Sequence, residues 1–331
     1  MALQVGEGRL WIGCPARRVL VTGGAGFIGS HLVDRLVADG HRVAVVDDLS
    51  SGRRDRVPSD VALHVADVVD ADAVTGVVTA CQPDVIYHLA AQISVRYSVA
   101  NPVADATTNI LGTMNLLNAA IAAGARLILA STGGAMYGDD VPLPTPETCS
   151  PGTHAPYGIA KYCAEQYLML FNRLHGGRHI ALRLGNAYGP RQDPHGEAGV
   201  VAIFCGQVAR GETPAIYGDG KQTRDYIYVA DVVDAFIAAT QCRVMRRCST
   251  SALATPRASS ISWTSSPPGR ATYIHVDHQY VAIADSPAPA SEPVHTGGRH
   301  QPPRQVLVGG LRERGWGHQG GRRRRRGRGS L

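Results

Sequence analysis

The first 240 residues alternate between two patterns of apolar positions. Short runs rich in Val, Ile and Leu predict strands, and longer segments with apolar residues three and four apart predict helices. The strand-like runs are nearly continuous in apolar residues, as expected for a parallel sheet that is buried on both faces. They occupy residues 18–24, 42–48, 61–67, 84–91, 126–132 and 179–189.

Helix-like segments separate these strands along the chain. They occupy residues 30–40, 72–81, 107–124 and 159–176, and three of the four end in or near Gly, which commonly terminates helices. Strands that alternate with helices of this length indicate a doubly wound α/β domain with a parallel, Rossmann-type sheet.

The same alternation predicts the domain organisation. Residues 18–189 form the Rossmann domain, and residues 1–17 are an N-terminal extension. Residues 190–223 contain more turns and one helix-like run, so we assign them to part of a smaller, incomplete substrate lobe over the carboxyl ends of the strands. Residues 224–240 return to a final strand and helix of the Rossmann domain. The pattern stops there, and residues 241–331 are a tail rich in Arg, Pro, Ser and Gly.

Charge divides the chain at the same place. Residues 1–240 carry 18 basic and 23 acidic side chains, whereas residues 241–331 carry 15 arginines and 4 acidic side chains. The run Arg322–Arg326 could attract phosphates, but no aromatic platform accompanies it. We therefore interpret the run as a solvated end and expect no nucleic-acid partner.

Cysteine spacing and hydropathy exclude other classes. The 7 cysteines are scattered and none forms a CxxC pair, so we expect neither a disulfide framework nor a metal site. No apolar run approaches the ~20 residues that span a bilayer. We expect a cytoplasmic protein that does not enter a membrane.

A glycine-rich loop follows the first predicted strand and opens the first helix. Gly23 permits a tight turn, Gly26 lets the backbone approach a pyrophosphate, and Gly29 lets helix and strand pack closely. Asp47 ends the next strand, where its carboxylate can accept hydrogen bonds from an adenosine ribose and would repel a 2′-phosphate. The loop and the acid together predict NAD rather than NADP as the cofactor.

A tyrosine and a lysine form the candidate catalytic pair. Tyr157 and Lys161 are four residues apart and therefore share one face of a predicted helix. We expect the lysine ammonium to lower the pKa of the Tyr157 phenol, which would then accept a proton from a sugar hydroxyl. Lys161 is one of two lysines in the chain, which suggests that this position requires a compact ammonium whose pKa its surroundings can shift.

These residues and the segments between them resemble the extended short-chain dehydrogenase/reductase family, and within it the UDP-glucose (UDP-galactose) 4-epimerase group. The resemblance covers residues 18–240 and includes VTGGAGFIGSHLVDRL, DDLSSG, HLAAQ, PYGIAK and IYGDGKQTRDYIYVADVVDAF. It implies an NAD-dependent enzyme that oxidises a UDP-hexose at C4, lets the 4-keto sugar turn over and reduces it on the other face. It also implies a homodimer through helices at residues 100–123 and 156–175.

The resemblance assigns roles position by position. The residues that would hold the NAD pyrophosphate are Gly23, Gly26, Phe27, Ile28 and Gly29, and those that would hold its ribose are Asp47, Asp48 and Ser51. The residues that would flank the adenine are Asp67 and Val68, and those that would line the nicotinamide half are Leu89, Ala90, Ala91 and Asn109. Tyr157 would be acid and base, and Lys161 its partner on the nicotinamide ribose. Asn186 and Arg224 would contact the nucleotide-sugar diphosphate.

The third catalytic group of the family is a Ser or Thr hydroxyl. Counting back from Tyr137 places Gly133 at that position, so we expect Thr132 to supply the hydroxyl, with Ser131 as the alternative. The segment lacks an Asp–Glu pair, which argues against sugar dehydration. A 4-epimerase of UDP-glucuronate or UDP-N-acetylglucosamine and a non-catalytic NAD-binding remnant remain open as alternatives.

Residues 241–331 do not resemble the family, whose members continue with elements that complete the sugar-nucleotide lobe. Residues 1–240 use 16 Arg and 2 Lys, as expected of GC-rich coding DNA, whose out-of-frame translation gives Arg, Pro, Ala, Ser and Gly. We therefore hypothesise a frameshift between residues 238 and 247 and expect reduced or absent activity. A genuine disordered extension is the alternative.

Overall fold

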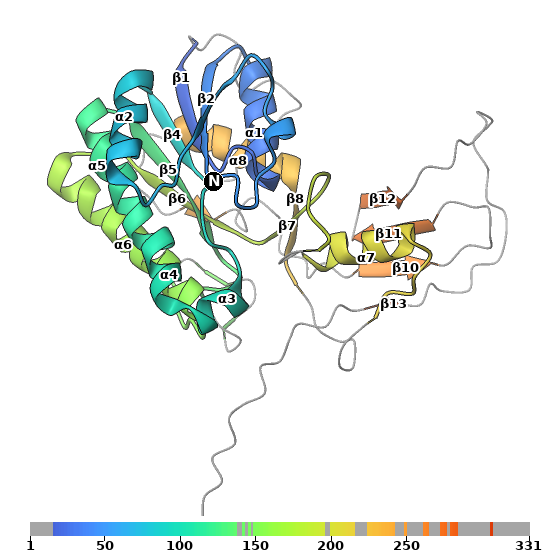
Figure 1. Cartoon of the computed structure of the whole chain (residues 1–331). Helices are drawn as coiled ribbons and strands as arrows, with labels where there is room; N and C mark the ends of the chain where they lie inside the picture. The colour runs from blue at the N-terminus through green and yellow to red at the C-terminus, as the bar shows by residue number, and fades with distance from the viewer. Residues whose placement is uncertain are drawn as a thin grey trace, which may run out of the picture.

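The protein is built around one parallel sheet with helices on both faces (Figure 1). The structure, a computed structural model, describes residues 16–137, 141–142, 145–146, 148–195, 199–215 and 224–241, and the backbone of short strands after residue 247. The strands of the sheet are β1 (Arg18–Thr22), β2 (Arg42–Asp47), β3 (Ala62–Val65), β4 (Val85–His88), β5 (Arg126–Thr132) and β6 (Ile180–Leu184). They are parallel in the order β3-β2-β1-β4-β5-β6, which confirms the doubly wound Rossmann-type fold.

Apolar side chains alternate between the two faces of the sheet, as the pleat of a strand requires. On β1, Val19 and Val21 join one core cluster and Leu20 joins the other. The first cluster packs under α1 (Phe27–Ala38) and α8 (Val229–Gln241), and the second under α2 (Ala71–Cys81), α5 (Gly112–Ala123) and α6 (Pro156–His175). Because both faces are covered, the polar ends of the strands are left for function.

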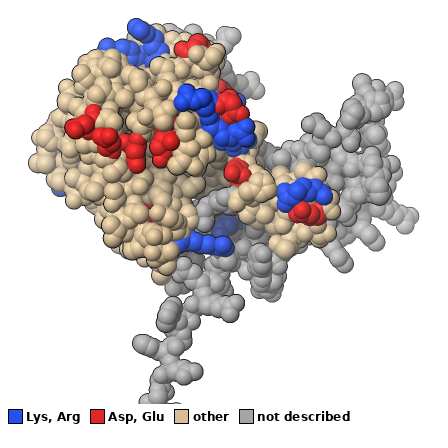
Figure 2. All heavy atoms as spheres, in the orientation of Figure 1, with Lys and Arg blue, Asp and Glu red and all other residues tan. Residues whose placement is uncertain are grey.

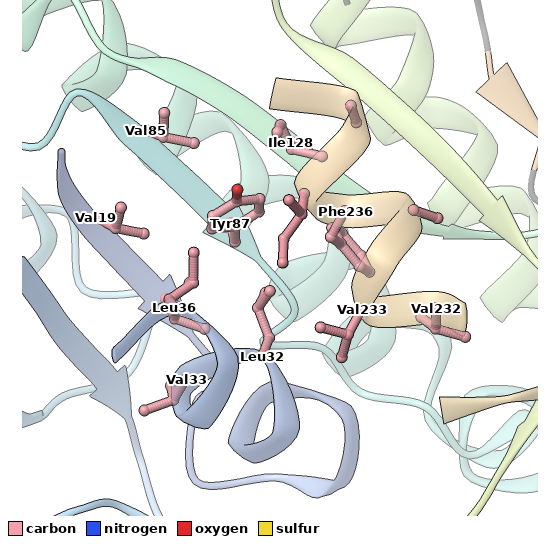
Figure 3. Packing of buried hydrophobic residues seen from close by; sticks show 14 of the residues in the cluster. Val19, Leu32, Val33, Leu36, Val85, Tyr87, Ile128, Val232, Val233 and Phe236 are labelled. Carbon is pink, nitrogen blue, oxygen red and sulfur yellow. The ribbon is translucent and has the colours of Figure 1, made fainter. Parts of the chain in front are cut away.

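Helix α8 brings a late segment of the chain onto the sheet. Figure 3 shows Val233 and Phe236 of α8 pointing toward Leu32 of α1 and Tyr87 of β4. The rings of Tyr87 and Phe236 meet edge to face with centroids 6.0 Å apart, and the Tyr87 hydroxyl lies 2.6 Å from Thr240 Oγ1. Helix α8 therefore packs on the same face of the sheet as α1.

The strand part of that segment pairs elsewhere. β8 (Tyr226–Tyr228) pairs in parallel with β7 (Asn186–Tyr188) in a separate two-stranded sheet. The strand predicted over residues 179–189 is thus divided into β6 and β7 at Gly185, where a Cβ would lie 3.0 Å from the Asp225 carboxylate. Beyond it, α7 (Val200–Ala209) packs Val201 and Phe204 against Tyr188.

The helix predicted over residues 107–124 is also divided. α3 (Val95–Ala100) and α4 (Pro102–Ala106) precede a π-helical turn over Thr107–Leu111, and α5 follows. Single π turns inside helices occur frequently at functional sites. As expected, left-handed glycines stand at or next to the ends of three helices, as Gly40, Gly124 and Gly176.

Short strands occur in the tail. β9 (Cys248–Ser249) lies beside β6 in the parallel sheet, and β10 (Ile261–Thr264), β11 (Thr272–Val276), β12 (Gln279–Ile283) and β13 (Gln305–Val306) form an antiparallel sheet in the order β12-β11-β10-β13. The domain boundaries and the frameshift hypothesis stay predictions. None of the described helices combines the length and apolar character needed to cross a membrane.

Removing the Phe236 ring should destabilise the fold. We expect Phe236→Ala to cost about 3–5 kcal/mol, since the ring is fully buried between α1 and the sheet. Urea unfolding should show a lower midpoint with an unchanged slope. The control is Leu174→Ala at a 66% exposed position of α6, with an expected change within about 0.5 kcal/mol. Equal losses in both variants would contradict the importance of this core.

Candidate active site

The glycine loop lies where the strand order reverses, between β1 and β4. Gly23 has a left-handed φ of 70°, and a Cβ placed on it would lie 2.6 Å from the backbone nitrogen of Ala90, just after β4. A side chain on Gly29 would collide with the carbonyl oxygen of Gly23. At Gly23 and Gly29 the backbone is therefore packed too closely for any residue but glycine, and the loop sits at the switch point where doubly wound sheets bind ligands.

The loop leads into the N-terminal end of α1 at this switch point. α1 begins at Phe27 with Gly26 as its N-cap, and no described side chain caps its first backbone N–H groups. A Cβ on Gly26 would approach only the Gly23 carbonyl, so space remains around it. Open N–H groups at the positive end of a helix suit the pyrophosphate of a dinucleotide. Ile28, also in the first turn, packs against the core.

Asp47 braces the loop from the neighbouring strand. Its carboxylate accepts hydrogen bonds from the backbone nitrogens of Ala25 and Leu49, both at 2.9 Å. It is 6% exposed, and burial raises its pKa. Asp48 and Ser51 are exposed just beyond it, and the Asp48 carboxylate accepts from Ser50. The acid predicted to hold the ribose thus also holds the glycine loop.

The predicted adenine residues follow β3 at the same edge of the sheet. Asp67 is exposed and accepts from the backbone of Val69, whereas Val68 is buried against Gly112 of α5. Asn115 of α5 donates to the carbonyl oxygens of Val68 and Val69 at 3.1 and 2.9 Å. The structure therefore places this segment beside the end of β2, although the contact with adenine stays a prediction.

The predicted nicotinamide residues Leu89, Ala90 and Ala91 follow β4 and are partly buried. The backbone nitrogens of Leu89 and Ala90 donate to Thr22, the last residue of β1. Asn109 is buried in the π-helical turn and donates to the carbonyl of Gln92 at 2.9 Å. The ends of β1 and β4 and the π turn therefore form one wall.

Tyr157 and Lys161 occupy the first two turns of α6, which begins at Pro156. The backbone nitrogen of Tyr157 donates to Ser98 Oγ at 3.2 Å, and Lys161 Nζ donates to the carbonyl of Ala130 on β5 at 3.1 Å. Gly158 allows the first turn of α6 to lie against the backbone of Ala135, because a Cβ at this position would collide with the carbonyl oxygen of Ala135. The pair is therefore positioned at the carboxyl end of β5.

The expected direction of the tyrosine pKa is wrong. Burial raises the pKa of Tyr157 to about 12, and the carboxylate of Asp105 raises it as well. Burial also lowers the pKa of Lys161 to about 8, against the opposing effects of Asp105 and Glu165. The prediction rested on an ammonium–phenol attraction, but the largest effect on both groups is desolvation, which disfavours the charged form of each.

Thr132 and Ser131 differ in how their hydroxyls are engaged. Thr132 Oγ1 accepts from the backbone nitrogen of Ala135 at 3.2 Å, which leaves its proton available for donation. Ser131 is buried, and its Oγ donates to Glu165 at 2.6 Å. Ser131 is therefore committed to the core, and Thr132 remains the better candidate for the catalytic hydroxyl.

A buried ion pair supports Ser131 and Thr132, the last two residues of β5. The guanidinium of Arg183 on β6 makes a bidentate pair with Glu165 on α6, and both side chains are 1% exposed. Arg183 also donates to the Tyr137 hydroxyl, and its guanidinium carbon lies 5.1 Å from the centre of the Tyr137 ring. Removing one partner of such a pair leaves a buried charge and typically costs about 3–5 kcal/mol.

Asn186 and Arg224 meet through the small β7–β8 sheet. Asn186 donates to the carbonyl of Asp225 from its backbone at 2.8 Å and from its side chain at 3.1 Å. Arg224, the neighbour of Asp225, is exposed. The backbone nitrogen of Gly133 donates to Leu184 at 2.8 Å, which joins the Thr132 turn to the strand that leads into Asn186. The two predicted diphosphate contacts are therefore adjacent to each other and continuous with the catalytic turn.

Several residues of this site escaped the sequence analysis. Glu165 and Arg183 belong to none of the motifs that we identified. An acid one turn after Lys161 and an arginine inside an apolar strand are nevertheless unusual, and these features could have indicated a buried ion pair. Asp105 comes close to the catalytic pair only after folding. Among the described residues, no group of His, Cys, Asp and Glu side chains could hold a metal ion.

A sequence model of the NAD dependent epimerase/dehydratase family matches residues 19–246. The chain belongs to this family. The match ends near the point at which the resemblance was expected to stop, and the tail lies largely beyond it. The glycine cradle and the open α1 N-terminus fit the cofactor that the family name states.

Several proteins are similar to this same part of the chain. A UDP-glucose 4-epimerase of Mycolicibacterium smegmatis is 50% identical over 228 residues, which cover 67% of this chain and 72% of that protein. The crystal structure of UDP-glucose 4-epimerase with UDP-glucose from Thermotoga maritima is 49% identical with a TM-score of 0.66, covering 67% of this chain and 73% of that one. The Thermus thermophilus UDP-glucose 4-epimerase in complex with NAD is 46% identical with a TM-score of 0.64, covering 67% and 74%.

A methyl group on Gly29 should damage the cofactor site. We expect Gly29→Ala to weaken NAD binding, measured by calorimetry, because the methyl group must displace the Gly23 backbone. The matched control is Gly76→Ala in α2, where a Cβ meets nothing within 4 Å. It should bind NAD normally and gain about 1 kcal/mol of stability from helix propensity. Equal NAD affinity of the two variants would contradict the assigned role of the loop.

Proposed function

We propose that the chain is an NAD-dependent epimerase that inverts C4 of a UDP-hexose, interconverting UDP-glucose and UDP-galactose. The observation that carries the proposal is the placement of Tyr157, Lys161 and Thr132 together at the carboxyl end of β5, two strands from the glycine loop. The similarity to the UDP-glucose 4-epimerases of M. smegmatis, T. maritima and T. thermophilus supports the choice of substrate.

The described side chains suit proton transfer at the sugar. The Tyr157 phenolate accepts the proton of the C4 hydroxyl and the resulting phenol returns it in the reverse step; because burial raises the pKa to about 12, the phenolate is a strong base but a minor form at neutral pH. Thr132 donates a hydrogen bond to the same sugar oxygen, since its own acceptor site is engaged by Ala135. The Lys161 ammonium stabilises the phenolate by its charge.

Other residues hold the two nucleotides. The Gly23–Gly29 loop and Asp47 would hold NAD, and the bound cofactor would supply reversible hydride transfer at the sugar carbon, so that the net redox change would be zero. Asn186 and Arg224 contact the diphosphate of the UDP-sugar, for which an arginine fork is well suited. The diphosphate thereby anchors the substrate while the sugar turns over.

The proposal is tested by incubating the purified full-length chain with UDP-galactose and following UDP-glucose by nuclear magnetic resonance. Conversion supports it. UDP-glucuronate and UDP-N-acetylglucosamine, assayed in parallel, separate the alternative substrates. Bound NAD without conversion of any UDP-sugar would overturn the proposal in favour of an NAD-binding remnant.

Substitutions at the catalytic turn should separate Thr132 from Ser131. We expect Tyr157→Phe and Thr132→Ala to lower kcat, the former by about 10²–10⁴-fold because it removes the base. Thr132→Ser retains the hydroxyl and should restore activity. Ser131→Ala should instead mainly reduce stability, because Glu165 loses a buried hydrogen-bond donor. Unchanged kcat in Thr132→Ala would contradict the assignment.

We also infer that two copies of the chain pair through α4, α5 and α6. Apolar side chains are exposed on α4, on the π turn that leads into α5 and on α6: Val103 is 78%, Leu111 49%, Ile159 52% and Tyr167 37% exposed. Figure 2 shows that the surface over α4 and α6 is largely uncharged. Such a patch on a monomer would favour association with a second copy.

A charge in this patch should disrupt the pairing. We expect Leu111→Arg to shift the chain from dimer to monomer in light scattering, because the guanidinium would be buried without a partner. Val65→Arg is the control, since Val65 is 54% exposed at the other edge of the sheet. It should remain dimeric. A dimer in both variants would place the interface elsewhere.

A further inference from the structure

A chain of buried hydrogen bonds links the glycine loop to α4. Thr22 Oγ1 lies 2.8 Å from His88 Nδ1, and His88 Nε2 lies 3.0 Å from Thr113 Oγ1. Thr113 donates to the carbonyl of Asn109 at 2.7 Å, and the Asn109 amide donates to Asp105 Oδ1 at 3.0 Å. All five residues are at most 1% exposed. The chain runs from the residue before the loop to a carboxylate behind the catalytic helix.

Asp105 is held rigidly and is incompletely satisfied. Its Oδ1 accepts from Gln92 Nε2 at 2.7 Å as well as from Asn109. Its Oδ2 is buried and finds no hydrogen-bond partner among the described residues. A buried carboxylate with a free oxygen is costly unless a cation compensates it. Burial raises the pKa of Asp105, whereas the hydrogen bonds from Gln92 and Asn109 and the charge of Lys161 lower it, so these groups favour the ionised carboxylate.

The positive charge comes from α6. α4 and the π turn pack directly against α6. Lys161 and Tyr157 are the groups on α6 whose protonation responds to Asp105. Lys161 also faces Glu165, but that carboxylate is already paired with Arg183. On the sheet side lies His88, whose pKa is lowered to about 3 by burial and by Lys161, so it stays neutral.

We propose that Asp105 is a positioning residue of the active site, whose fixed carboxylate is the counter-ion that keeps buried Lys161 an ammonium beside Tyr157. The proposal rests on the function proposed above. Lys161 is 3% exposed, and its ammonium donates to the neutral Ala130 carbonyl, so burial alone would favour loss of its charge. Asp105 opposes that loss, and through Asn109 and Gln92 it also braces the wall on which the nicotinamide half is expected.

The direct test is the titration of Lys161 in Asp105→Asn, which preserves shape and removes charge. The chain has two lysines, so lysine labelled with ¹³C at Cε gives two signals, and Lys221→Arg assigns them. In the unaltered chain Lys161 should titrate near pH 8. Because Asp105 raises its pKa, the substitution should move the titration to lower pH. The control Asp72→Asn, at an exposed position of α2, should not.

An unchanged Lys161 titration in Asp105→Asn would overturn the proposal. If that variant does not fold, Gln92→Leu removes one of the two donors to Oδ1 and destabilises the ionised carboxylate. It should then move the Lys161 titration in the same direction, and no shift there would likewise overturn the proposal. Neither titration requires turnover, so the outcome is independent of whether the chain epimerises a UDP-sugar.

Kinetics distinguish positioning from a merely structural role. In Asp105→Asn both limbs of the pH profile of kcat/KM should move to lower pH, because Asp105 raises the pKa of Tyr157 and of Lys161. Asp105→Glu keeps the charge and should restore the profile. A reduced rate with an unshifted profile would indicate a structural role and contradict the proposal. An inactive unaltered chain with a shifted Lys161 titration would reject the proposed function alone.

Discussion

The close backbone contact between the loop after β1 and the segment after β4 is the constraint on which the site depends. Gly23 can approach Ala90 only because it has no side chain, and this contact sits where neighbouring strands send their connections to opposite faces of the sheet. The contact aims the open end of α1 into the crevice. Asp47 then fixes the loop from β2 by binding the backbone of Ala25.

Burial governs the chemistry of this crevice more than the attraction between neighbouring charges. It raises the pKa of Tyr157 and lowers that of Lys161, because each charged form loses its hydration. Buried groups of opposite charge offset part of this lost hydration. Arg183 and Glu165 satisfy each other beneath the Thr132 turn, and Asp105 remains for the catalytic helix.

Local pattern predicted the elements that depend on local physics. The six parallel strands, the glycine loop and the paired placement of Tyr157 and Lys161 follow from apolar runs, glycine spacing and helical period. Prediction was weaker where tertiary contacts intervene. A single helix over residues 107–124 became a π turn and α5, and the strand over 179–189 divided at Gly185, where Asp225 packs against the backbone.

The sequence by itself determined the fold class and predicted the cofactor loop and the candidate catalytic pair, because local apolar patterns and motifs of neighbouring residues identify them. Only the tertiary structure showed how burial shifts the pKa values of that pair and that the Ser131 hydroxyl is bound to Glu165. These depend on Glu165, Arg183 and Asp105, which folding brings together from α6, β6 and α4. Burial and charge act through space, so residues far apart in sequence determine the chemistry of residues that the sequence identifies.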